Sequence, residues 1–199
     1  MNAPSAWDYR DTTVGLEGWK GQLEELRTAF LALAGGLDAE QFDWQPAPGK
    51  WSIGQILAHL NATNHEIQGP LRRALGTARA HEVTGQPPFD YGFLGRWFLD
   101  EVAPPPKHAA RAPRRYVPEP GDESGKDAVL AAYETQHAEL LQLMQDADGL
   151  HLARVKMRSP ALWLLNLPVG IWFASIPAHA ARHLVQARTV RENPGFPRG

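Results

Sequence analysis

The chain has 199 residues, of which 43% are hydrophobic, and a formal net charge of −2. This size and apolar content suit one domain with a substantial core, so we assign residues 1–199 to a single domain. The near-balanced charge excludes a general electrostatic attraction to nucleic acid. A local basic cluster is interpreted as a solvated loop, and no nucleic-acid partner is expected; it consists of Arg111, Arg114 and Arg115. The absence of cysteine excludes disulfides, thiolate nucleophiles and Cys-ligated zinc.

The location of the protein is suggested by its N-terminus, which lacks the basic-then-apolar layout of a signal peptide. We therefore expect a cytoplasmic protein. The stretch 161–181 contains no charged residue and is long enough to span a bilayer. However, it is interrupted by Asn166, Pro168 and Pro177. We interpret it as an apolar loop followed by a buried helix, and we expect no membrane partner.

The first predicted helix covers residues 13–34, where apolar side chains alternate spacings of three and four and form one stripe. Thr12 or Thr13 is expected to cap its start. Asp38, followed three residues later by Gln41, predicts a capping box for one further helical turn.

The second predicted helix begins after Ser52, because Gln55 stands three residues further on and completes a capping box. Trp51 precedes the cap and Ile56 follows it at the spacing of a hydrophobic staple. The apolar stripe then continues for several turns. Pro70 should kink this helix or end its regular part, because it has no N–H to donate.

Residues 76–125 are rich in proline and enclose an aromatic island between Phe89 and Phe98. A structureless loop of this length would be unusual in a compact domain, so we expect an irregular crossover whose aromatic residues form a short helix packed on the bundle. A crossover this long allows the second and third main helices to run parallel.

The third predicted helix begins near Ser124, and the fourth runs from about Pro168 or Ile171 to Arg191. We find no β-hairpin signal and little strand pattern. Four amphipathic helices joined by one long crossover therefore predict an all-α four-helix bundle.

Three histidines stand out because they lie on or beside the predicted apolar stripes. His179 and His183 are four residues apart, so their imidazoles share one face of the fourth helix. His59 lies on the shoulder of the stripe of the second helix, and a ligand from a facing helix is how bundles build metal sites. A buried imidazole needs partners for both nitrogens, and a metal satisfies one of them. We predict that the three hold one divalent metal ion; the alternative is three metal-free core histidines.

Other polar residues are weaker candidates. For His137, on the stripe of the third helix, a supporting or ordinary core role is favoured over that of a fourth ligand. Glu134 and His137 form one Glu-x-x-His, as in di-iron bundles, but the fourth helix has no second such motif. Glu66 lies two turns beyond His59 and is interpreted as a solvated carboxylate. No catalytic residue is assigned.

Two stretches resemble the signatures of the DinB/YfiT-like superfamily of small bundles: PAPGKWSIGQILAHLNATNHE at 46–66, and HAARHLVQARTVRENP at 179–194, which contains His-x-x-x-His-x-x-Gln. The resemblance implies an up-down-down-up bundle, often dimeric, with a metal held by the residues that match the family ligands. These are His59, His179 and His183. Gln186 matches the trailing Gln and is expected near the metal rather than on it.

The resemblance leaves the activity open, because the superfamily includes thiol-dependent transferases and proteins described as metal-dependent hydrolases. Three imidazoles leave an open position on the ion, which suits either chemistry, and the metal could be Zn, Ni, Fe or Mn. We expect a homodimer that acts on a small thiol or another small molecule. The alternative is a non-catalytic dimeric binding or scaffold bundle whose metal is structural or absent.

Overall fold

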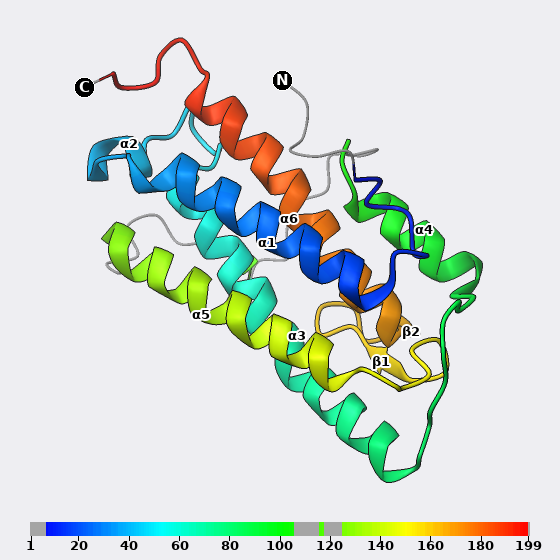
Figure 1. Ribbon diagram of the computed structural model, residues 1–199. Coiled ribbons are helices and arrows are strands. Elements are labelled where there is room, and N and C mark those ends of the chain that lie inside the picture. Colours follow the sequence, from blue (N-terminus) through cyan, green and yellow to red (C-terminus); the bar gives the residue numbers. More distant parts are fainter. Residues whose placement is uncertain (1–6, 106–115, 118–124, 199) are drawn as a thin grey trace.

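The computed structural model describes residues 7–105, 116–117 and 125–198, so the basic cluster at 111–115 lies outside it. Four long helices form a bundle (Figure 1), which confirms the predicted all-α four-helix fold. In chain order the elements are α1 (Gly15–Gly35), α2 (Ala39–Asp43), α3 (Ile53–Ala80), α4 (Gly92–Val102), α5 (Gly125–Asp146), β1 (Lys156–Arg158), β2 (Asn166–Pro168) and α6 (Val169–Arg191).

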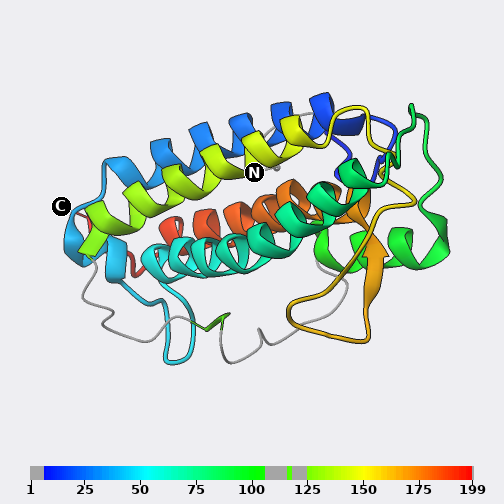
Figure 2. The same cartoon turned by 90° about the horizontal axis from the view of Figure 1, so that it is seen from below.

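The four long helices are arranged in two layers, with α1 and α5 in one and α3 and α6 in the other (Figure 2). The most extensive contacts are between α3 and α5 and between α1 and α6. The helices α3 and α5 begin at the same end of the bundle, and α1 and α6 begin at the opposite end (Figure 1). Consecutive main helices α3 and α5 therefore run parallel, and α3 faces α6 inside one layer.

Two capping boxes fix the starts of α2 and α3 as predicted. The Ser52 hydroxyl accepts the Gln55 N–H at 3.0 Å, and the Gln55 side-chain carbonyl accepts the Ser52 N–H at 3.1 Å. The same reciprocal pair joins Asp38 and Gln41 at 2.8 and 3.2 Å. Each box satisfies N–H groups that the first turn of a helix leaves without partners. The cap at Ser52 therefore fixes the start of the helix that carries His59.

Two other helix boundaries differ from the prediction. Val14, which has no side-chain cap bond, precedes α1, while Thr13 donates its hydroxyl to the Asp11 carboxylate at 2.6 Å. The helix α3 continues past Pro70 to Ala80, so the irregular segment starts beyond residue 80 rather than at 76. Proline removes one backbone bond, and the packing of α3 along α5 outweighs that loss.

The β-hairpin formed by β1 and β2 contradicts the expectation that the chain has no hairpin. The strands pair antiparallel, with Met157 opposite Leu167. Each strand has three residues, which is too short for a period-2 pattern to be recognised. Trp172 of α6 donates its indole N–H to the Met157 carbonyl at 3.0 Å. The hairpin is thereby fixed to the start of α6.

The aromatic segment forms α4, which packs against the start of α6. Two glycines allow this close approach. A Cβ on Gly95 would lie 2.7 Å from the Ile171 side chain, and a Cβ on Gly170 would overlap the Tyr91 ring. The opposite face of α4 is exposed.

The helix α6 is the most buried element, with 16 inward residues that include nearly all of its first half. This burial explains the charge-free stretch 161–181, whose helical part is core. Among the described residues, no helix is long and apolar enough to cross a membrane.

Candidate metal centre

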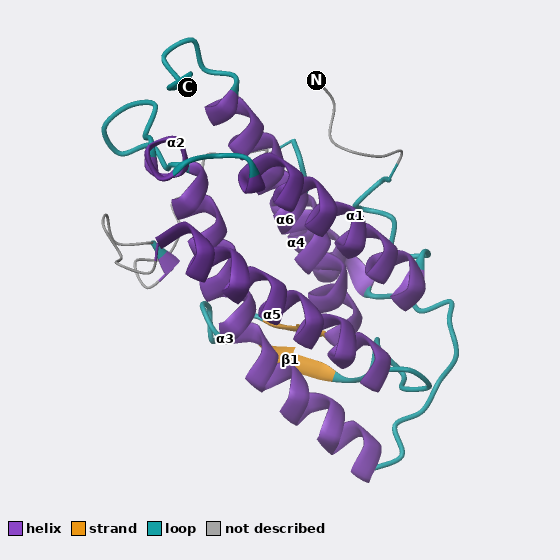
Figure 3. Ribbon diagram, turned by 60° about the vertical axis from the view of Figure 1, so that its left-hand side comes forward, coloured by secondary structure: helices purple, strands orange, loops and turns teal. Residues whose placement is uncertain are grey.

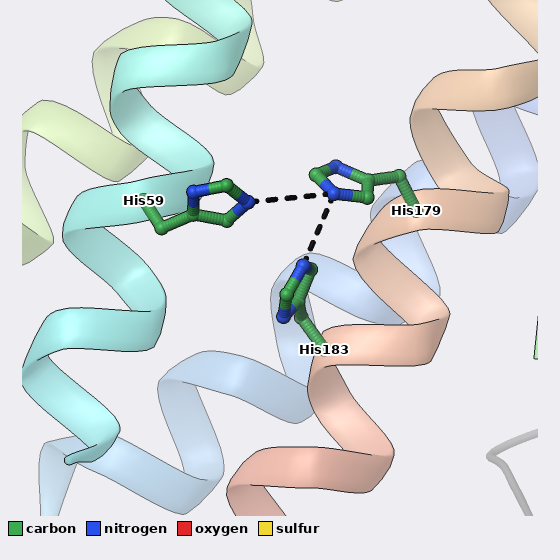
Figure 4. Close-up of side chains that lie close together, drawn as sticks. All are labelled: His59, His179 and His183. Atoms are coloured by element: carbon green, nitrogen blue, oxygen red, sulfur yellow. Dashed lines mark hydrogen bonds between the residues drawn. The ribbon is translucent and has the colours of Figure 1, made fainter. Parts of the chain in front are cut away.

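The facing helices α3 and α6 bring the three predicted histidines together (Figure 4). The Nε2 atom of His179 lies 3.0 Å from that of His183 and 3.5 Å from that of His59. His179 and His183 occupy successive turns of α6, and His59 reaches them from the second turn of α3. One potential ligand atom from each ring lies within 4.8 Å of the others.

Hydrogen bonds to the opposite ring nitrogens orient two of the imidazoles. The Nδ1 atom of His59 lies 2.7 Å from the backbone carbonyl of Tyr116, and that of His183 lies 2.9 Å from the side-chain oxygen of Gln186. Because a carbonyl oxygen can only accept, both Nδ1 atoms must carry the proton. Both Nε2 atoms therefore present a lone pair to the centre of the cluster.

Burial keeps these imidazoles neutral. His59 and His183 are buried, and His179 is half-buried. Desolvation lowers the pKa of His59 and, with the neighbouring histidines and Arg182, lowers that of His179 well below its ordinary value. Burial and the proximity of His59 lower the pKa of His183 to about 3. A neutral imidazole is the form that ligates a metal.

The donor set fits a divalent metal ion. Nitrogen ligands about 2.0–2.1 Å from a tetrahedral zinc lie roughly 3.3 Å from one another. Two of the three separations, 3.0 and 3.5 Å, are close to this value, and the third pair, His59 and His183, lies within 4.8 Å. Without an ion, the Nε2 atom of His179 has at most one proton to share between the lone pairs of His59 and His183. The cluster therefore has more inward lone pairs than protons to bond them, and a metal ion could accept all three lone pairs.

Two further residues border the cluster, and the sequence did not predict this role for either of them. The centroid of the Trp51 ring lies 4.8 Å from the centroid of the His59 ring and 6.1 Å from that of the His183 ring, on which it stacks. From the sequence, Trp51 was expected only to form a hydrophobic staple with Ile56, because it precedes the Ser52 cap. Tyr116 reaches His59 through a backbone carbonyl 57 residues away, and no local sequence pattern signals such a contact.

The weaker candidates lie outside the cluster or support it. His137 of α5 is buried and pairs with Glu24 at 3.1 Å. Glu134 binds Arg27 through both carboxylate oxygens, so the Glu-x-x-His motif is used in contacts between α5 and α1. Glu66 is exposed. Gln186 lies beside the cluster, because its side-chain oxygen is 2.9 Å from the Nδ1 atom of His183.

Comparison with solved structures finds the same fold in YfiT from Bacillus subtilis, with a TM-score of 0.58 and 14% sequence identity over 92% of this chain and 89% of that chain. That protein is described as "a probable metal-dependent hydrolase with an unusual four-helix bundle topology". At this identity the likeness establishes the fold alone. No curated protein sequence matches the chain. The sequence profile of the DinB superfamily matches residues 22–187, which is most of the chain, and the chain therefore belongs to the DinB superfamily.

Proposed function

We propose that this protein is a metal-dependent enzyme, a hydrolase or a thiol-dependent S-transferase, whose single divalent ion is held by His59, His179 and His183. The convergence of their three Nε2 atoms carries the proposal, since two of the rings are fixed through Nδ1 with their lone pairs directed inward. The match to the family and the fold shared with YfiT support the same assignment.

The ligand set determines the chemistry. Neutral imidazoles contribute no negative charge, and three of them leave positions open for water or substrate. An ion bound there would act as a Lewis acid and lower the pKa of a water molecule or thiol bound to it. Imidazole ligands suit Zn, Ni and Fe, whereas Mn, the fourth candidate, prefers oxygen ligands.

The electrostatic surroundings of the cluster favour anionic groups. Within the described part of the chain, no Asp or Glu side chain hydrogen-bonds to the three histidines. Arg182, held by the Glu101 carbonyl at 3.1 Å, places a positive charge close enough to lower the pKa of His179 and His183. This charge favours an anionic nucleophile or substrate group at the centre.

Removal of the metal distinguishes an enzyme from the competing possibility, a non-catalytic bundle with a structural ion. The apolar core between the helices is extensive, so a catalytic ion should leave with little change in the thermal unfolding midpoint, whereas a structural ion should take much of the stability with it. We would unfold the chelated protein and the protein reloaded with Zn, Ni or Mn, and assay both on ester and thiol-transfer substrates. Metal-dependent turnover with a small shift in midpoint is expected. A large loss of stability without turnover under any metal would support the structural role.

We also propose that the protein is a homodimer. The α4 helix exposes an apolar face of three large side chains, Phe93 at 79%, Leu94 at 49% and Trp97 at 46%. Exposed apolar patches of this kind commonly mark interfaces. A second copy would bury them.

A further inference from the structure

A second concave feature lies away from the histidine cluster, between the C-terminal half of α3 and β1. Figure 3 shows β1 alongside this part of α3. The groove encloses about 480 Å³, a volume within the range of small-molecule sites. On α3 it begins at Pro70, eleven residues after His59, which is about 16 Å along the helix axis. None of the three histidines lines it.

The floor of this basic groove is apolar, and its rim carries arginine, lysine and histidine side chains. Ala78, Val155 and Met157 are buried residues of the floor. The rim is formed by side chains that are all exposed and all basic: Arg73, His81, Arg154, Lys156 and Arg158. The residues alternate along β1, where Met157 points inward while Lys156 and Arg158 point outward.

Carboxylates are absent from both walls. The stretches 67–81 and 149–191, which supply nearly all of the lining, contain no Asp or Glu, although 22 of the 199 residues of the chain are acidic. Within the described residues, Arg73, Arg154 and Lys156 have no ion-pair partner. The groove therefore combines a local positive potential with a protein of net charge −2.

We propose that the basic groove binds a small amphiphilic anion, with a phosphate or carboxylate head against the arginines and an apolar body on the floor. Guanidinium groups match the geometry of these heads and hold them through paired hydrogen bonds. The floor would shield an alkyl or ring group of the ligand from water. This site is independent of the proposed metal centre.

Isothermal titration with octyl phosphate, kept below its micelle concentration, tests the proposal. We expect one site per chain, weakened at least tenfold in Arg73→Gln/Arg154→Gln and in Thr77→Trp, because Thr77 is an exposed lining residue whose enlargement fills the groove without changing its charge. Arg72→Gln is the matched control. Arg72 neighbours Arg73 but faces Glu139 of α5 at 3.7 Å, so this variant should bind within twofold of the wild type.

Three further experiments test the class of ligand and the place where it binds. Inorganic phosphate and the neutral detergent octyl glucoside should each bind at least tenfold more weakly, since each lacks one half of the amphiphile. Zinc-loaded and metal-free protein should bind octyl phosphate equally. Vesicles containing phosphatidylglycerol test a bilayer as the alternative source of the anionic head, because the neighbouring hairpin tip exposes Leu162, Trp163 and Leu164.

The proposal is overturned if octyl phosphate does not bind, or if its binding is unaffected by Arg73→Gln/Arg154→Gln and Thr77→Trp. Binding that requires the metal would place the ligand at the histidine cluster instead. Binding to anionic vesicles without binding to free octyl phosphate would assign the surface to a membrane and would also overturn a small-ligand site.

Discussion

At the scale of single residues, proton positions decide whether the three histidines can share an ion. The Tyr116 carbonyl and the Gln186 side chain hold protons on the Nδ1 atoms of His59 and His183. Such outer partners fix the tautomer of a ligand and raise its basicity. The sequence predicted the histidines because they interrupt apolar stripes. It could not predict Tyr116 or the ring of Trp51, since both contacts depend on how distant segments pack.

Gln186→Leu removes the acceptor for the His183 Nδ1 proton while keeping a side chain of similar size. Loss of such a partner typically weakens metal binding about 10–100-fold. Competition with a chelator of known affinity measures this change. Thr189→Ala, one turn further along α6 and exposed, is the control and should bind as the wild type does. Equal affinity in Gln186→Leu and the wild type would show that Gln186 does not support the ligand.

The stability of the metal-free protein should fall in mild acid. Burial holds the pKa of His183 near 3 and lowers those of His59 and His179. Below the ordinary histidine pKa of about 6.5, the unfolded chain binds protons that the folded chain does not, so stability is full above that value and decreases as the pH falls toward 3. His183 alone should cost about 2 kcal/mol between pH 7 and pH 5.

Urea unfolding of the chelated protein at the two pH values measures this loss. His183→Asn removes one of the titrating groups and should lose less stability over the same interval. An identical pH dependence in the variant and the wild type would contradict a depressed pKa at His183.

At the scale of elements, local signals predict the helix boundaries that short-range contacts fix and miss those that tertiary packing fixes. The caps at Ser52 and Asp38 were predictable because both partners lie within four residues. The passage of α3 through Pro70 depends on tertiary packing that a propensity cannot include. The hairpin β1–β2 was missed because three-residue strands give too short a pattern. Even so, the positions of the four long helices, and with them the faces that carry the histidines, follow from the sequence.

Two glycine substitutions, one at the close contact between α4 and α6 and one at an open position of α3, test the packing of the bundle. Gly170→Ala would force a methyl group into the Tyr91 ring, and such overpacking typically costs about 1–3 kcal/mol. Gly76 lies inside α3 with no other atom within 4 Å of an added Cβ. Gly76→Ala should therefore raise stability by about 0.5–1 kcal/mol. Chemical unfolding measures the free energy of unfolding of both variants. A Gly170→Ala variant as stable as the wild type would refute tight packing between Gly170 and Tyr91.

At the scale of the whole molecule, the exposed face of α4 bears on self-association. Sedimentation at micromolar concentration should show a dimer, and Phe93→Ser/Trp97→Ser should shift it to a monomer, because both side chains are exposed in one copy. Both substitutions replace exposed side chains and should leave helix content unchanged. A wild-type monomer, or a variant that remains dimeric, would rule out dimerisation through α4.

The bundle as a whole holds three converging histidines on two facing helices without a carboxylate among them. We propose that this cluster binds one divalent metal ion. The fold gives a control within the same chain, because His137 is also buried but pairs with Glu24 across the α1–α5 contact.

Elemental analysis of the purified protein counts the metal ions bound per chain. The protein must be untagged, since a histidine tag would itself bind metal. We predict about one divalent ion per chain in the wild type and in His137→Ala, and none in His59→Ala/His179→Ala, whose helix content should be unchanged. Wild-type protein that contains no metal after reconstitution with Zn, Ni and Mn, or a double variant that retains its ion, would contradict the assignment.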